Sequence, residues 1–115
     1  MTDAVRFTRN VAEVLRVFLD DATEPRYGFE LMQRTGLPSG TLYPILARLE
    51  GAGWLESHRE NIDPADAHRP ARRFYRITAE GERVARLELA ALSDRLRPPA
   101  PSKPTGGLRP QGGLT

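Results

Sequence analysis

Residues 27–55 read YGFELMQRTGLPSGTLYPILARLEGAGWL and carry the clearest structural pattern in this chain of 115 residues. Apolar side chains at helical spacing predict a helix over residues 28–35, and Gly36 is well placed to end it in the left-handed conformation. A second helix is expected to begin at Ser39, because a serine oxygen can cap the free backbone N–H groups of a first turn. A Gly-x-Gly break then leads into a strand. This order of elements is that of a helix-turn-helix. The buried side of the first helix is predicted to consist of Phe29, Leu31 and Met32.

The second helix of this pair has an apolar face and a polar edge. The predicted core face consists of Leu42, Ile45, Leu46 and Leu49. The residues left on the outer side are Ser39, Gly40, Thr41, Tyr43, Pro44, Ala47 and Arg48. They concentrate at the N-terminal end, where a recognition helix contacts base edges and where free N–H groups bind phosphate. The alternatives are that Ser39 is only a cap and that Tyr43 only packs on Pro44 or the turn.

Two strands with a long loop between them follow. They are predicted over residues 54–60 and 72–78, which are rich in aromatic and β-branched side chains. The loop NIDPADAHRP, residues 61–70, is made of turn residues and should have a mobile tip. This hairpin can serve as a wing that reaches the DNA backbone or an adjacent groove, or it can be a solvated hairpin with local ion pairs. Its cationic residues are His58, Arg59, His68, Arg69, Arg72, Arg73 and Arg76.

Helices are also predicted on either side of this motif. One covers residues 8–19, with Thr8 or Asn10 as its cap, and the other covers residues 79–97 after a Thr78 cap. The apolar stripe of the last helix is wider than a single small core can cover, so it serves either the core or a dimer interface. The predicted interface residues are Val11, Leu15, Phe18, Leu87, Leu89, Leu92 and Leu96.

The predicted fold class is mainly α with a two-stranded β wing. We expect a winged helix-turn-helix domain over residues 1–78, a dimerisation helix over 79–97 and a disordered Pro/Gly-rich tail over 98–115. The net charge is only +2, but 16 of the 17 basic residues are Arg, which suits bidentate contacts to phosphate and guanine.

Several function classes are excluded by what the sequence lacks. It contains no Cys, and its two histidines lie in the wing region, so no metal site or other cofactor is expected. No nucleophile motif, P-loop or dinucleotide fingerprint appears, so we expect no catalytic residues and no enzyme. With neither a signal peptide nor a membrane span visible, we expect a cytoplasmic protein without membrane contact.

Two motifs together resemble the PadR family of bacterial transcription regulators. The run SGTLYPILARLEGAGWL is similar to that family's recognition helix and strand entry, and YRITAEG is similar to its exit from the wing into the dimer helix. The resemblance covers residues 8–97 and best matches the short form with one C-terminal helix. It implies a homodimer, usually a repressor, on a palindromic operator. The DNA contacts that it implies are Tyr27, Ser39, Gly40, Thr41, Tyr43 and wing arginines.

The sequence therefore predicts a regulator that binds double-stranded DNA sequence-specifically as a homodimeric repressor. The alternative is a winged-helix protein-interaction module without specific DNA binding. A small-molecule effector is left open: some short relatives bind flat hydrophobic ligands through an aromatic residue on the last helix, which here has none. The expected DNA-binding residues are Tyr27, Ser39, Gly40, Thr41, Tyr43, Arg48, Arg72 and Arg73.

Overall fold

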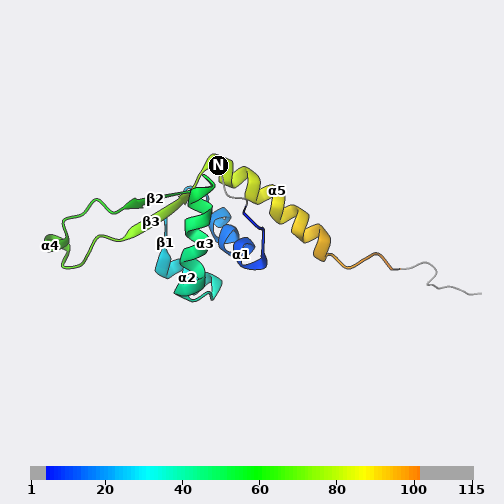
Figure 1. Cartoon of the computed structure of the whole chain (residues 1–115), viewed down its shortest axis with the longest axis horizontal. Coiled ribbons are helices and arrows are strands. Elements are labelled where there is room, and N and C mark those ends of the chain that lie inside the picture. The colour runs from blue at the N-terminus through cyan, green and yellow to red at the C-terminus, as the bar shows by residue number, and fades with distance from the viewer. Residues whose placement is uncertain (1–4, 102–115) are drawn as a thin grey trace, which may run out of the picture.

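The computed structural model describes residues 5–101, and its helices and strands follow the predicted order. In Figure 1 the wing and the last helix leave the helical body on opposite sides. The predicted tail lies outside the described residues from residue 102 onward, and residues 98–101 are in neither helix nor strand. The elements are α1 (Arg9–Asp20), β1 (Arg26–Tyr27), α2 (Gly28–Thr35), α3 (Ser39–Gly51), β2 (Leu55–Arg59), α4 (Pro64–Ala67), β3 (Arg73–Ile77) and α5 (Ala79–Leu96).

The core lies where α1, α2 and α3 meet the root of the wing and the start of α5. Helix α1 contributes more buried residues to this core than any other element does, and Leu31 of α2 and Ala85 of α5 also belong to it. The predicted inner face of α3 is confirmed, because all four of its residues are buried, namely Leu42, Ile45, Leu46 and Leu49. Burial of these side chains supplies the main driving force for folding.

The structure corrects part of the expected dimer interface. Val11, Leu15 and Phe18 are buried among the other core residues of the same chain. They were expected to face a partner because α1 has a single apolar stripe, but that stripe packs against α5, α2 and β3 of the same chain. On the side of α1 that faces a groove, the lining residues are instead Arg9, Ala12, Glu13 and Arg16.

Two of the predicted helix caps are confirmed and one is wrong. Thr8 caps α1 by accepting from the backbone N–H of Val11, and Thr78 caps α5 by accepting from that of Gly81. Ser39, however, is already the first residue of α3 and makes no capping bond. The Pro38 carbonyl accepts from the N–H groups of residues 41 and 42 instead, so Pro38 is the N-cap and the helix begins at Ser39 as predicted. The Ser39 hydroxyl is therefore exposed and not committed to a cap.

The wing contains one strand more than predicted. β2 and β3 pair over five residues each, within one residue of the expected bounds, and β1 adds to the outer edge of β3. The pairs Arg26↔Tyr75 and Tyr27↔Phe74 define its register. A strand of two residues has no alternation to read from a sequence. Strand β1 matters because it ties the start of α2 to the wing.

The loop at the wing tip also differs from the prediction, because it contains the short helix α4. Asp63 accepts a hydrogen bond from the Ala65 N–H, and Pro64 occupies the first helical position. Both residues favour a helix start, although the same Asp-Pro pair also occurs in turns. His68 then ends the turn in the left-handed region.

Candidate nucleic-acid interface

The outer edge of α3 is free of the rest of the chain at its N-terminal end. Ser39 and Gly40 are exposed, Thr41 is half-buried and the Tyr43 side chain is 44% exposed. The first N–H groups of a helix have no partner within it and carry partial positive charge, so this end favours anionic groups. Because the core face is fully buried beneath it, the edge is held rigidly in place.

The structure brings one predicted residue of α3, Tyr43, together with Tyr27 and two predicted arginines of the wing. A hollow of about 380 Å³ separates them and is lined by Tyr27, Gly28, Phe29, Tyr43, Arg72 and Arg73. Four of the predicted DNA-binding residues thus meet, although they come from three distant parts of the sequence. Arg48 is exposed on the same helix but lies more than one turn beyond Tyr43 and does not line the hollow.

Tyr43 packs over the first residue of α2. A Cβ atom added to Gly28 would collide with the Tyr43 hydroxyl and the adjacent ring carbon, so only glycine leaves room for the ring. The predicted alternative placed Tyr43 on Pro44 or the turn, whereas the structure packs its ring against the start of α2. One part of the ring contacts α2, and the remainder is exposed on the α3 edge.

Phe29 corrects the expected burial of α2. It was predicted to face the core, but its side chain is 68% exposed and lines the hollow beside Tyr43. Helical spacing could not separate it from its core neighbours, because residues 29, 31 and 32 span too wide an arc for one short helix to bury. An exposed aromatic ring next to two arginines is suited to an apolar contact with a deoxyribose or a thymine methyl group.

The wing presents two arginines that no carboxylate neutralises. Within residues 5–101, neither Arg72 nor Arg73 forms an ion pair, and Arg73 donates only to the neutral Ser57 hydroxyl, at 2.9 Å. Arg69 differs, because its guanidinium binds the Glu60 carboxylate. Within the cationic cluster predicted from sequence, Arg72 and Arg73 therefore have no ion pair, whereas Arg69 is paired.

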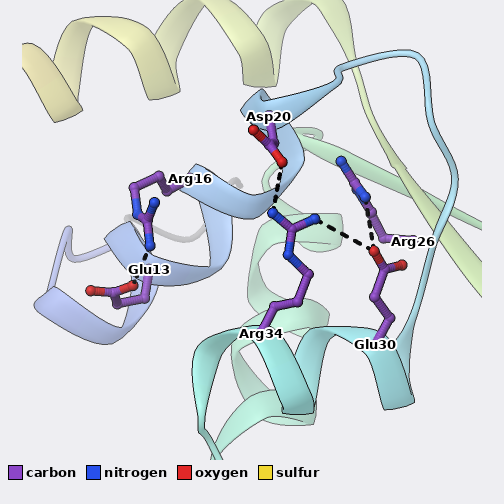
Figure 2. Close-up of polar contacts among 6 residues, drawn as sticks. All are labelled: Glu13, Arg16, Asp20, Arg26, Glu30 and Arg34. Atoms are coloured by element: carbon purple, nitrogen blue, oxygen red, sulfur yellow. Dashed lines mark hydrogen bonds and ion pairs between the residues drawn. The ribbon is translucent and has the colours of Figure 1, made fainter.

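A chain of ion pairs fixes α2 between α1 and β1 (Figure 2). Arg34 of α2 donates to Asp20 Oδ2 at the end of α1 at 2.7 Å, and its other terminal nitrogen lies 3.6 Å from Glu30 Oε2. The same Glu30 oxygen accepts from Arg26 Nη1 at 2.8 Å. The hydrogen bond from Arg34 lowers the pKa of Asp20, so this carboxylate stays charged. These ion pairs link the end of α1 to α2, and α2 to β1.

This surface and the elements that hold it define a winged helix-turn-helix DNA-binding protein. The profile of the Transcriptional regulator PadR-like family matches residues 14–87, which is well over half of the chain. The chain therefore belongs to the PadR-like family, whose members are transcriptional regulators and not enzymes. The family resemblance expected from the sequence and the winged-helix fold class are both confirmed.

Solved structures are similar over most of the chain. Smu.1704 from Streptococcus mutans UA159 is 23% identical, with a TM-score of 0.63 over 83% of this chain and 86% of its own. A PadR-like transcription factor from Bacteroides fragilis is 24% identical, with a TM-score of 0.60 over 76% and 85%. A PadR family transcriptional regulator from Eggerthella lenta DSM 2243 is 29% identical, with a TM-score of 0.56 over 76% and 80%.

No match to a curated protein was found. In the part of the chain that the structure describes, no helix has both the length and the apolar character needed to cross a bilayer.

Proposed function

We propose that the protein is a sequence-specific repressor that binds a palindromic operator as a homodimer. The observation that supports this most directly is the hollow in which the α3 edge, the start of α2 and the wing arginines face one another. A duplex laid against these elements would place α3 in the major groove and the wing arginines on the adjacent backbone.

In this mode the exposed residues of α3 supply base choice. Ser39, Thr41 and Tyr43 carry hydroxyl groups that can exchange hydrogen bonds with base edges, and Gly40 lets the helix approach closely. Arg72 and Arg73 would bind phosphates, which contributes affinity without sequence preference. Tyr27 and Arg48 border this surface and complete the set of DNA contacts that we propose.

A groove between α1 and α5 supports the dimer. It has a volume of about 910 Å³, and on the α5 side it is lined by Leu89, Leu92, Ser93 and Leu96, together with Arg97 just after the helix. Leu96 is 73% exposed in the single chain, and exposed apolar surface of this kind usually marks a partner site. The α5 helix of a second copy presents the same apolar stripe, so a two-fold interface would cover both grooves. Leu87 is also exposed but does not line this groove.

The arrangement of α5 relative to the wing fits a two-fold operator. Because α5 leaves the body on the side opposite the wing, pairing through α5 leaves both wings free at the outer ends (Figure 1). Two α3 helices about 34 Å apart would enter successive major grooves on one side of the duplex. A protein bound in this way blocks the DNA that it covers, which is the simplest route to repression.

Footprinting on the DNA upstream of the protein's own gene tests this proposal. We expect two protected half-sites, related by two-fold symmetry and separated by one helical turn, and we expect protection to need the dimer. Leu96→Asp should yield a monomer by sedimentation and abolish the paired footprint. Ala91→Asp, an exposed site that does not line the groove, should leave both unchanged. A stable monomer that gives no footprint would favour a protein-interaction module instead.

A further inference from the structure

Glu60 directly follows β2, and its carboxylate joins three separate segments of the chain. Oε1 accepts from Arg69 Nη1 at 2.6 Å and from the Arg72 backbone N–H at 2.9 Å. Oε2 accepts from the Tyr27 hydroxyl at 3.1 Å and from Arg69 Nη2 at 3.3 Å. The Glu60 side chain is only 13% exposed, so solvent competes weakly for these bonds. One carboxylate thus closes the long wing loop and ties it to the start of α2.

The bidentate hydrogen bonds to Glu60 neutralise the guanidinium charge of Arg69. Two parallel N–H···O bonds between a guanidinium and a carboxylate are among the stronger polar contacts in proteins. A phosphate would have to displace them to recruit Arg69. Arg72 and Arg73 have no such partner among the described residues. Of these three wing arginines, two are therefore available to DNA and one is withheld.

Glu60 also fixes the backbone from which Arg72 projects. The Glu60 N–H donates to the Arg72 carbonyl at 2.8 Å, and the Arg72 N–H donates back to the Glu60 side chain. The Arg72 side chain then lines the hollow shared with Tyr27 and Tyr43. On the other side, the Tyr27 ring lies 6.0 Å from the Phe74 ring, centroid to centroid, and the two residues pair in the sheet. These contacts set the separation between the free cations and the edge of α3.

We propose that Glu60 is a positioning residue that holds the wing against the start of α2 and keeps Arg69 off the DNA. The inference deepens the proposed function and rests on its DNA-binding mode. It predicts that removing the Glu60 charge creates a new phosphate contact rather than destroying one. A purely structural role for Glu60 predicts the opposite, because a loosened wing would hold its arginines less firmly against the phosphates.

The test is the salt dependence of binding to a random duplex, since the slope of log affinity against log salt reports the number of phosphates neutralised. We expect Glu60→Gln to bind random DNA several-fold more tightly and to steepen this slope by about one. The ratio of operator affinity to random affinity should fall. The double variant Glu60→Gln/Arg69→Gln removes both charges and should return the slope to the wild-type value.

Glu80→Gln is the matched control. Glu80 forms an exposed ion pair with Arg83 on α5, and its substitution changes the net charge by the same amount. Its slope should equal that of the wild type. The proposal is overturned if Glu60→Gln leaves the slope unchanged or lowers it. It is equally overturned if the double variant has a slope about one unit shallower than the wild type, because Arg69 would then bind a phosphate in the wild-type complex.

Nuclear magnetic resonance of the arginine side chains in the wild-type protein decides the matter if Glu60→Gln does not fold. Addition of duplex DNA should shift the guanidinium signals of Arg72 and Arg73 and leave that of Arg69 in place. A shift of Arg69 comparable to theirs would contradict the proposal. Wild-type protein with no duplex affinity even at low salt would instead refute the proposed function itself, and this inference with it.

Discussion

The aromatic ring of Tyr43 occupies the space that any side chain at Gly28 would need. This contact joins the recognition helix to the first residue of α2, so the position of the Tyr43 hydroxyl depends on a residue outside that helix. The ring is partly exposed and can turn into solvent, whereas the helix backbone at residue 28 cannot move without disturbing β1.

Gly28→Ala should therefore fold and yet lose operator preference. The new methyl group displaces the ring of Tyr43, and a good base contact contributes about 1–3 kcal/mol of discrimination. Competition binding with operator and random duplex measures the change. Because the substitution acts through Tyr43, the double variant Gly28→Ala/Tyr43→Ala should discriminate no worse than Tyr43→Ala alone. Additive losses would show that Gly28 acts by some other route.

Gly81 makes a different kind of close approach. A Cβ at this position in the first turn of α5 would collide with the backbone of Trp54, whose carbonyl also accepts from the Thr78 N–H. Since backbone cannot rotate away, Gly81→Ala should lower the free energy of unfolding by about 1–3 kcal/mol or more. Urea denaturation measures this change in the free energy of unfolding. Gly51→Ala, at the open end of α3, is the control and should have little effect.

Substitutions on the edge of α3 should relax specificity without loosening the fold. We expect Thr41→Ala and Tyr43→Ala each to reduce the preference for operator over random DNA by about 1–3 kcal/mol, the usual contribution of one good base contact. Affinity for random duplex should change much less. Glu88→Ala on the exposed side of α5 serves as the control. If both α3 variants kept full operator preference, base choice would have to come from another part of the protein.

The two wing arginines without ion pairs should act on all DNA alike. Arg72→Ala and Arg73→Ala should each weaken binding to operator and random duplex by the same factor and reduce the salt slope by about one for each phosphate that is no longer neutralised. Arg83→Ala, which removes an equally charged side chain from α5, should leave the slope unchanged. A selective loss of operator binding in the wing variants would assign these arginines to base readout instead.

Glu60 should make folding stability depend on pH in acid. Hydrogen bonds from Arg69 lower the pKa of this carboxyl from its ordinary value of 4.5 to about 2 in the folded protein. A lowered folded-state pKa means that the charged form stabilises the fold, fully above 4.5 and progressively less as the pH falls toward 2. The difference in unfolding free energy between wild type and Glu60→Gln should shrink over that range in urea denaturation. A difference independent of pH would mean that the Glu60 charge contributes nothing.

Much of the fold could be predicted because its signals are local. The inner face of α3, the Gly36 stop and the Thr78 cap each depend on residues within a few positions of one another, and the structure confirms all three. The start of α3 at Ser39 is also confirmed, but its cap was wrongly assigned to Ser39, because only the hydrogen bonds show that Pro38 is the N-cap.

The parts of the interface that could not be predicted depend on contacts between distant residues. Glu60 reads as an ordinary wing acid until Tyr27, 33 residues away in sequence, is seen to donate to it. The burial of the α1 stripe and the exposure of Phe29 are likewise decided by packing and not by spacing. The sequence could therefore nominate the members of the interface but not the contacts that hold them together.

The most direct test of DNA reading by the exposed edge of α3 is a competition titration of the wild-type protein at physiological salt. Labelled duplex from upstream of its own gene is displaced by unlabelled copies of itself or by a shuffled duplex of equal length and composition. A specific regulator should require at least about a thousandfold more shuffled DNA for the same displacement. Equal displacement by the two competitors would contradict sequence-specific reading by this edge.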